Sequence, residues 1–230
     1  MLVVIEGLDG AGKSTQVKMA KEYIQSNGVN LKYLHFPRYE GSIYGDLIAR
    51  FLRGEFGTID TVHPQLVALL FAEDRHDAAT IIRKWINEGY TVLLDRYVYS
   101  NIAYQCSKLN NFDEAQKLRN WIFDTEYGLF GIPKPDINLF LDVPLSFVDK
   151  MLKENREGNE RDYLNGKADI HEASIDFQSN VRKFYIAQTE SDKNFIRINC
   201  SDSKGEMLPP EEIFKKISPL LPIKRPINLK

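Results

Sequence analysis

The clearest chemical pattern in the chain is a glycine-rich loop near its start, followed by a lysine and a serine. Gly, four residues, Gly, Lys and then Ser or Thr is typical of a loop that binds nucleotide phosphates, and here it reads Gly7-Leu8-Asp9-Gly10-Ala11-Gly12-Lys13-Ser14-Thr15. The glycines allow a tight turn whose backbone N–H groups can point at phosphate oxygens. Lys13 can reach the terminal phosphates of a nucleotide, and the Ser14 hydroxyl can ligate magnesium. The sequence therefore predicts a phosphate-binding site at residues 7–15.

A second pair of residues that could bind a metal ion or a phosphate, Asp95 and Arg96, follows an apolar segment at 90–94. Asp95 could hold magnesium through water beside a phosphate loop, and it could equally be the N-cap of the next helix. The planar guanidinium of Arg96 suits bidentate binding of phosphate. The same reasoning applies to Arg38, which follows the rigid Pro37.

One arginine in a helical pattern lies where an apolar residue is expected. Phe71, Arg75, Ala78, Ile82 and Trp85 recur at steps of four, three, four and three residues, which places Arg75 on the buried stripe of a helix. A buried arginine must be paired or must serve a ligand. Phe71, one turn earlier, could stack on a flat base, although its spacing alone favours core packing.

A polar segment at 155–167 carries cations and almost no apolar residue. It can be a solvated surface connection, or a lid whose cations close over a transferring phosphate and exclude water. Its position opposite the phosphate loop favours the lid, which we place at about residues 155–168. The cations in or beside it are Lys153, Arg156, Arg161 and Lys167.

Alternating strand and helix patterns must position these residues. Apolar runs predict strands at 2–6, 31–36, 90–94, 137–141 and 195–198, and helical spacing predicts helices at 13–26, 43–51, 64–87, 100–109, 112–127, 144–153, 169–189 and 210–220. Thr61 is the expected cap of the third helix, with Pro64 in its first turn. This alternation indicates an α/β fold with a parallel sheet covered on both faces. Because ligands bind at the carboxyl ends of such strands, we expect the phosphate loop, Arg38 and Arg96 to face one cleft.

Composition limits the remaining possibilities. The 230 residues are 43% hydrophobic, which suffices for a full core. The net charge of -2 gives no basic field that would indicate binding to nucleic acid. Cys106 and Cys200 suit a reducing cytosol as plain thiols, and we find neither a signal peptide nor a run of membrane-spanning length. We therefore expect one cytoplasmic domain over residues 1–230, with a surface tail at about 222–230.

Together these residues resemble those of the thymidylate kinase family, whose members are nucleoside monophosphate kinases with a phosphate loop. The resemblance covers nearly the whole chain and rests on segments 6–15, 36–39, 70–75, 95–104 and 133–136. It implies a three-layer P-loop NTPase fold, with a five-stranded parallel sheet, helices on both faces and a lid segment. It also implies a homodimer that transfers the γ-phosphoryl group of ATP, bound with Mg²⁺, to dTMP, giving dTDP.

The resemblance assigns contacts to the base and sugar of dTMP. Phe71 should stack on thymine, Arg75 should donate to its exocyclic oxygen, and Asn101 should bond the ring edge. Tyr104 should crowd the sugar 2′ position and so reject ribonucleotides. Asp9 should touch the 3′-hydroxyl.

The resemblance also assigns phosphate, metal and catalytic roles. Arg38 and Arg96 should bind the acceptor phosphate. His171 falls near a position where the family contacts the acceptor or its magnesium, and residues 199–202 fall near the adenine loop. The other predicted dTMP-pocket residues are Phe36, Tyr39 and Asp169. The predicted metal ligands are Ser14, Asp95 and Glu172. The predicted catalytic residues are Asp9, Lys13, Arg96, Arg156 and Arg161.

Two departures from the family pattern affect these roles. One branch of the family has an arginine in the phosphate loop where this chain has Gly10, so the catalytic cation would come from the lid, through Arg156 or Arg161. Asn101 replaces a glycine that is common in another branch, so the contact to the thymine edge depends on the branch.

Other functions remain possible at this stage. The acceptor could be another nucleoside monophosphate or a deoxynucleoside, and the second would require a general base for the 5′-hydroxyl, for which Glu6 is a candidate. A GTPase would require an Asn-Lys-x-Asp guanine motif, which the chain lacks. An inert scaffold is disfavoured by the intact Lys13, Ser14, Asp95 and Arg96.

Overall fold

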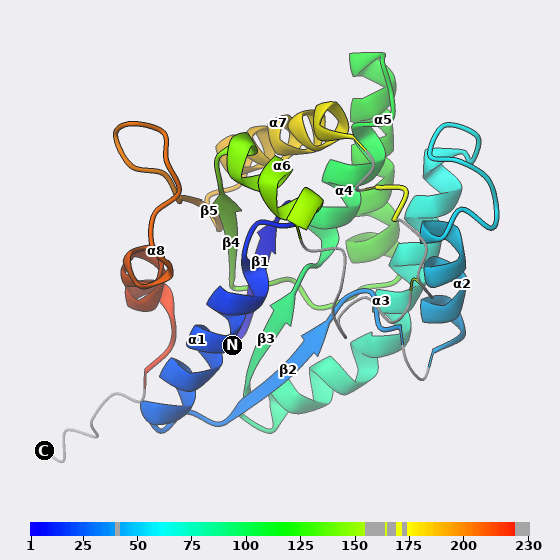
Figure 1. The fold of residues 1–230 in the computed structure, drawn as a ribbon. Coiled ribbons are helices and arrows are strands. Elements are labelled where there is room, and N and C mark those ends of the chain that lie inside the picture. Colours follow the sequence, from blue (N-terminus) through cyan, green and yellow to red (C-terminus); the bar gives the residue numbers. More distant parts are fainter. Residues whose placement is uncertain (40–41, 155–163, 165–168, 172–173, 224–230) are drawn as a thin grey trace, which may run out of the picture.

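The computed structural model describes residues 1–39, 42–154, 164, 169–171 and 174–223. They form a five-stranded sheet covered by helices (Figure 1). The strands are β1 (Leu2–Gly7), β2 (Leu31–His35), β3 (Thr91–Asp95), β4 (Ile137–Asp142) and β5 (Phe195–Asn199). The α-helices are α1 (Lys13–Ser26), α2 (Ile43–Leu52), α3 (Pro64–Asn87), α4 (Val98–Cys106), α5 (Phe112–Phe123), α6 (Leu145–Glu154), α7 (Ile175–Ser191) and α8 (Pro210–Ile217). A π-helix, η1 (Asp124–Leu129), follows α5, and a 3-10 helix, η3 (Ser218–Leu220), follows α8.

The sheet is parallel throughout, with the strand order β2-β3-β1-β4-β5. β1 lies between β3 and β4 and is buried along its whole length, which explains its nearly continuous apolar run. The chain first builds the β2 and β3 side of β1 and then crosses to the β4 and β5 side. The strand order therefore switches at β1, and a crevice for ligands is expected where β1 ends.

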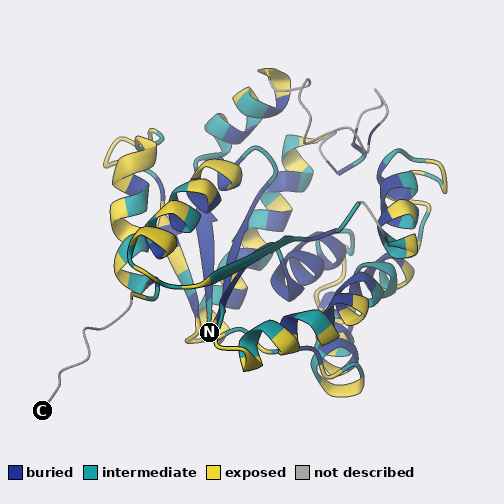
Figure 2. Ribbon diagram, turned by 90° about the horizontal axis from the view of Figure 1, so that it is seen from below, coloured by how far each residue is buried: buried dark blue, intermediate teal, exposed yellow. Residues whose placement is uncertain are grey.

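Helices cover both faces of the sheet, which confirms the predicted three-layer α/β fold. α1 and α8 contact each other and pack on one face, while α3, α4 and α7 cover the other (Figure 1). β1, β3 and β4 are buried between the helices, whereas the edge strand β2 is only partly buried. Figure 2 shows these buried strands and the exposed outer sides of the helices. α2 packs on α3, α5 on α4 and α6 on α7, so these three helices extend the outer layer.

The segment after the predicted lid differs from the expected helix at 169–189. α7 begins at Ile175, because the Ser174 side chain accepts a hydrogen bond from the Phe177 N–H and caps the helix there. Upstream, Asp169 accepts a hydrogen bond from the His171 N–H at 2.8 Å. Asp169 and His171 therefore precede the helix instead of lying on its first turn.

The start of α3 also differs in one residue. Pro64 occupies the first turn as predicted, but the cap is His63, whose Nδ1 accepts a hydrogen bond from the Gln65 N–H at 3.2 Å. The expected Thr61 cap is wrong, because the Thr61 hydroxyl instead accepts from the Thr58 N–H in the preceding turn.

Two predicted features fall outside the described residues. They are the lid, apart from Leu164, and most of the tail, of which residues 224–230 are not described. Within the described part of the chain, no helix combines the length and apolarity needed to cross a bilayer.

Candidate active site

The phosphate loop occupies the turn between β1 and α1, as the sequence predicts. Gly10 and Gly12 have φ values of 70° and 72°, a conformation that glycine adopts without a steric penalty. Gly12 precedes α1. No side chain caps this helix, and its first turn contains no acidic residue. The first N–H groups of α1 and the positive end of its dipole are thus available to an anion.

Lys13 is folded back over this loop. Its Nζ donates a hydrogen bond to the Leu8 carbonyl at 2.7 Å. Burial lowers the pKa of Lys13 to about 8, against the opposing charges of Asp95 and Asp9. The lysine is therefore a buried cation beside the N-terminus of α1, where the charge of a phosphate would be stabilised.

The glycine at position 10 has a local structural reason. A Cβ atom on Gly10 would lie 3.2 Å from Cβ of Met151 in α6, in addition to the strain of the positive φ. An arginine at this position, as in one branch of the family that the sequence resembles, would require at least a small shift of Met151.

Asp95 ends β3 beside the loop and is buried. Its Oδ1 has no hydrogen-bond partner among the described residues. The residue before α4 is Tyr97, and no side chain caps that helix, so the alternative role of Asp95 as an N-cap is wrong. An orphaned carboxylate oxygen next to a phosphate loop fits an oxygen ligand of Mg²⁺.

Metal binding by protein side chains alone is not indicated in the described residues. They contain no group of three His, Cys, Asp or Glu side chains arranged to hold a metal ion. Mg²⁺ is usually held by one or two protein ligands together with substrate phosphates. Ser14 is exposed at the start of α1, and Glu172, the third predicted metal ligand, lies outside the described residues.

Arg96 has a strained backbone. It is the one non-glycine residue with a positive φ, 65°, in the described part of the chain, and such strain is typical of functional sites. Its Nη2 pairs with Oδ1 of Asp9 at 2.5 Å, and its Nη1 donates to Oγ of Ser100 at 3.1 Å. Burial opposes the charge of Arg96, but Tyr104 and Asp9 raise its pKa well above the usual value.

Asp9 is the ionised partner of this arginine. Burial alone would raise the pKa of Asp9, but the charges of Arg96 and Lys13 lower it to about 2. Its Oδ2 accepts hydrogen bonds from the Tyr104 hydroxyl at 2.7 Å and from Nε2 of Gln178 at 3.1 Å. Asp9 thus links the phosphate loop to α4 and α7.

Glu6, near the end of β1, contacts Ser100, which in turn accepts a hydrogen bond from Arg96. Its carboxylate is 0% exposed and accepts hydrogen bonds from the Tyr97 N–H at 2.9 Å, from the Ser100 side chain and from the Tyr185 hydroxyl at 3.1 Å. Burial raises the pKa of Glu6. Since its oxygens are occupied by these donors, Glu6 is not placed to act as a general base on a ligand.

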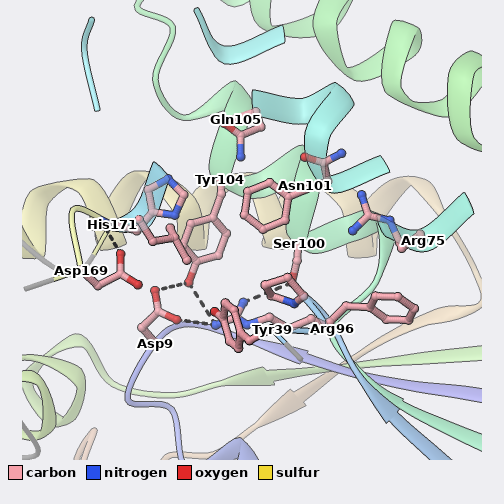
Figure 3. A pocket seen from close by; sticks show the side chains of 14 residues that line it. Asp9, Tyr39, Arg75, Arg96, Ser100, Asn101, Tyr104, Gln105, Asp169 and His171 are labelled. Carbon is pink, nitrogen blue, oxygen red and sulfur yellow. Dashed lines mark hydrogen bonds and ion pairs between the residues drawn. The ribbon is translucent and has the colours of Figure 1, made fainter. Parts of the chain in front are cut away.

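One cavity brings together all the predicted dTMP residues except Arg38. It is bounded by the phosphate loop, the segments after β2 and β3, the end of α2, α3, α4 and the turn before α7 (Figure 3). The predicted residues that line it are Asp9, Phe36, Tyr39, Phe71, Arg75, Arg96, Asn101, Tyr104 and Asp169. Residues without a predicted pocket role also line it, namely Pro37, Leu52, Ser100 and Gln105, and so does His171.

Arg75 and Asn101 meet at one side of this cavity and share a partner that the sequence analysis missed. Arg75 is buried as predicted, with 2% exposure, and forms a bidentate ion pair with Glu126 of η1. Asn101 donates to the same carboxylate at 2.9 Å. A signal for Glu126 was present, because Ala115, Leu118 and Ile122 form a buried stripe that continues to position 126.

Arg38 is turned away from the cavity lining. It forms ion pairs with Asp74 at 2.9 Å and with Asp77 at 2.6 Å, both on α3, and its N–H donates to Asp74 as well. These pairs hold Nε and Nη2 of Arg38, and the guanidinium does not line the cavity in which the acceptor is predicted to bind. The predicted lid residues Arg156 and Arg161 lie outside the described residues.

A parallel sheet whose central strand runs into a phosphate loop, facing a cavity lined by arginines and aromatic rings, defines a P-loop nucleotide-binding protein. The family model described as thymidylate kinase matches residues 5–208. The chain therefore belongs to the thymidylate kinase family.

Individual relatives agree with this assignment. A thymidylate kinase from Mycobacterium tuberculosis is 38% identical over 143 residues, which is 62% of this chain and 66% of the relative. One from Plasmodium falciparum is 34% identical over 146 residues, which is 64% of this chain and 63% of the relative. The matches thus span slightly less than two thirds of these relatives. The solved thymidylate kinase from Candida albicans, described as having broad substrate specificity, superposes with a TM-score of 0.71 at 27% identity, over 95% of this chain and 89% of that chain.

Proposed function

We propose that this protein transfers the γ-phosphoryl group of ATP to dTMP, giving ADP and dTDP. The observation that carries the proposal is the position of Arg96 and Asp9, which lie at the phosphate loop and also line the cavity that contains Phe71, Arg75 and Asn101. A phosphoryl donor held by the loop and an acceptor held in the cavity would meet beside Arg96.

The chemistry follows from charge and alignment. An oxygen of the dTMP phosphate attacks the γ-phosphorus of ATP, a P–O bond forms, and the bond from the γ-phosphorus to the bridging oxygen breaks as ADP leaves. Negative charge spreads over the equatorial oxygens of the transferred group. Lys13 and Arg96 offset this charge and hold donor and acceptor in line. The acceptor oxygen is already an anion, so no general base is required.

Mg²⁺ is the implied cofactor. Asp95, through its orphaned Oδ1, and Ser14 would hold it, and when bound it would neutralise charge on the donor phosphates. Glu172 and the lid arginines Arg156 and Arg161 keep their predicted roles as proposals.

A nucleoside kinase is the alternative that the geometry disfavours. Phosphorylation of a 5′-hydroxyl needs a base within hydrogen-bonding reach. Glu6, the candidate from the sequence, is fully buried and accepts hydrogen bonds from Tyr97, Ser100 and Tyr185. The remaining proposals follow the family: ATP and dTMP as ligands, no nucleic-acid or membrane partner, a homodimer and a cytoplasmic location.

The proposal is tested with a panel of phosphate acceptors. Initial rates of ADP formation would be measured with ATP, Mg²⁺ and dTMP, dUMP, dGMP or thymidine. We expect the highest kcat/KM with dTMP and no turnover with thymidine. Lys13→Ala and Arg96→Ala should each lower kcat by orders of magnitude, with unchanged folding by circular dichroism. Faster phosphorylation of thymidine than of dTMP, or near-wild-type turnover in either variant, would contradict the proposed function or role.

A further inference from the structure

Glu126 is a fully buried carboxylate that does not line the cavity but holds two residues that do. It is 0% exposed at the start of η1. Its Oε1 accepts from Nη2 of Arg75 at 2.7 Å and from Nδ2 of Asn101 at 2.9 Å, and its Oε2 accepts from Nε of Arg75 at 2.5 Å. One carboxylate therefore fixes both polar side chains. Figure 3 shows these two side chains, Arg75 and Asn101, on the same side of the cavity.

This contact decides which end of the Asn101 amide faces the cavity. The atom of Asn101 that lies 2.9 Å from Glu126 also lies 3.0 Å from the Ala68 carbonyl. Both neighbours are acceptors only, so that atom must be the NH₂ group. The other amide atom, Oδ1, is then the carbonyl, and it is buried without a hydrogen-bond partner among the described residues. Asn101 thus offers the cavity an acceptor.

Glu126 also fixes the orientation of the Arg75 guanidinium. Two of its three nitrogens, Nε and Nη2, are bonded to Glu126, which leaves Nη1 for the cavity that Arg75 lines. A guanidinium has donors and no acceptor. The wall therefore presents a fixed donor from Arg75 beside a fixed acceptor from Asn101.

We infer that Glu126 is a positioning residue that selects pyrimidine nucleotides with a 4-oxo group over those with a 4-amino group. This rests on the proposed function, in which the cavity holds a pyrimidine nucleotide. A 4-oxo pyrimidine has an acceptor at O4 and a donor at N3–H, which match Arg75 and Asn101. Cytosine has a donor at N4 and an acceptor at N3, so both contacts would be reversed. Glu126, together with the Ala68 carbonyl, prevents the Asn101 amide from turning to accommodate them.

The test compares dUMP with dCMP, because both lack the 5-methyl group and differ only at the edge in question. We expect the wild-type protein to prefer dUMP by about 10³-fold or more in kcat/KM, since each reversed contact leaves buried groups unpaired. In Glu126→Gln the new amide can donate as well as accept, so only the Ala68 carbonyl still holds the Asn101 NH₂ group in place, and Arg75 loses one of the two acceptors that orient it. The ratio of dUMP to dCMP should then fall at least about tenfold, through loss of dUMP activity and gain of dCMP activity.

A control variant distinguishes specificity from general damage. Asp142→Asn changes another buried carboxylate, which pairs with Arg182 and Arg197 at the end of β4 and does not line the cavity. Its dUMP to dCMP ratio should equal that of the wild type. If Glu126 were only structural, Glu126→Gln would lower both activities equally and leave the ratio unchanged, which would overturn the inference.

A second variant covers the possibility that Glu126→Gln does not fold. Asn101→Ala removes the fixed acceptor but leaves the Arg75–Glu126 pair intact, and it should also lower the ratio at least about tenfold. An unchanged ratio in Asn101→Ala would mean that Asn101 does not contact the base edge, and the inference would be wrong. If the wild-type protein phosphorylates neither dTMP nor dUMP, the proposed function is wrong and the inference falls with it. If it phosphorylates both and the variants keep the wild-type ratio, only the inference is overturned.

Discussion

At the scale of single residues, the site is built from charges that burial opposes. Lys13 shows this most directly, because it is a cation in a buried position whose neighbours only partly offset the loss of water. Burial lowers its pKa to about 8, whereas the pKa of Asp9 is held at about 2 by Arg96 and Lys13 in spite of burial. Of these two groups, Lys13 is therefore the one that changes charge near pH 8.

The pKa of Lys13 gives a prediction for the pH dependence of activity. Lys13 must be protonated to attract the phosphates of ATP, and it loses its proton as the pH rises through about 8. The value of kcat/KM for ATP, which reports the free enzyme, should therefore fall as the pH rises above about 8. At saturating ATP the bound phosphates favour the cation, so kcat should fall only at higher pH. Residual activity of Lys13→Arg should lack this decline, because arginine stays charged. A wild-type profile that is flat to pH about 10 would contradict the assignment.

The residues of the site were predictable to different degrees. Arg75 was found because it interrupts an apolar stripe, and Glu126 carries the same signal on the stripe of α5 and η1. The pairing between them was not predictable, because it depends on how α3 packs against η1. The same holds for Arg38, since no local pattern shows that Asp74 and Asp77 lie beside the segment after β2.

At the scale of secondary-structure elements, α2 sets the position of the segment that follows β2. Gly45, in the first turn of α2, is packed against this segment. A Cβ atom on Gly45 would lie 1.7 Å from the Arg38 carbonyl oxygen and 3.1 Å from Cα of Tyr39. Both are backbone atoms, so neither can move without shifting the chain that carries Tyr39 into the cavity.

Gly45→Ala should therefore affect both stability and acceptor binding. We expect a loss of about 1–3 kcal/mol in the free energy of unfolding and a rise in KM for dTMP, because Tyr39 would be displaced. Urea denaturation and steady-state kinetics measure the two effects. Gly128→Ala in η1 is the matched control, since a Cβ atom at Gly128 would meet no packed neighbour within 4 Å among the described residues, and it should stay within about 0.5 kcal/mol of the wild type. Equal behaviour of the two variants would show that the close approach of α2 has no energetic consequence.

The elements themselves were predicted well where their patterns are long. All five strands and, apart from the start of α7, the helices were expected within a few residues, because periodicity and turn residues identify them. The start of α7 was missed, because the sequence just before Ser174 also has a helical pattern, whereas the Ser174 cap begins the helix at Ile175. The π-helix η1 was predicted partly as helix and partly as loop, because its first residues continue the spacing of α5 and its last residues include Gly128.

At the scale of the whole molecule, the strand order places two parts of the site on one crevice. They are the phosphate loop and the cavity, and we call them the two half-sites. β1 delivers the phosphate loop, while β3, α3 and α4 deliver Arg96 and the cavity. Asp9 and Arg96 join the halves by an ion pair. If residues 1–230 are a single domain, as the sequence predicts, ligands of either half-site should stabilise one and the same folding unit.

Thermal unfolding tests this organisation. A ligand at 100 times its Kd stabilises the native state by about 2.7 kcal/mol, which should raise Tm by about 5–11 °C in a chain of this size. We expect a single transition that ADP with Mg²⁺ and dTMP each move to higher temperature, and that moves further with both, since this pair cannot react. Lys13→Ala should abolish the shift with ADP and keep the shift with dTMP, whereas Asn101→Ala should reduce only the shift with dTMP. Two transitions, each moved by one ligand, would show instead that the half-sites belong to separately folding units, because a ligand stabilises only the unit that binds it.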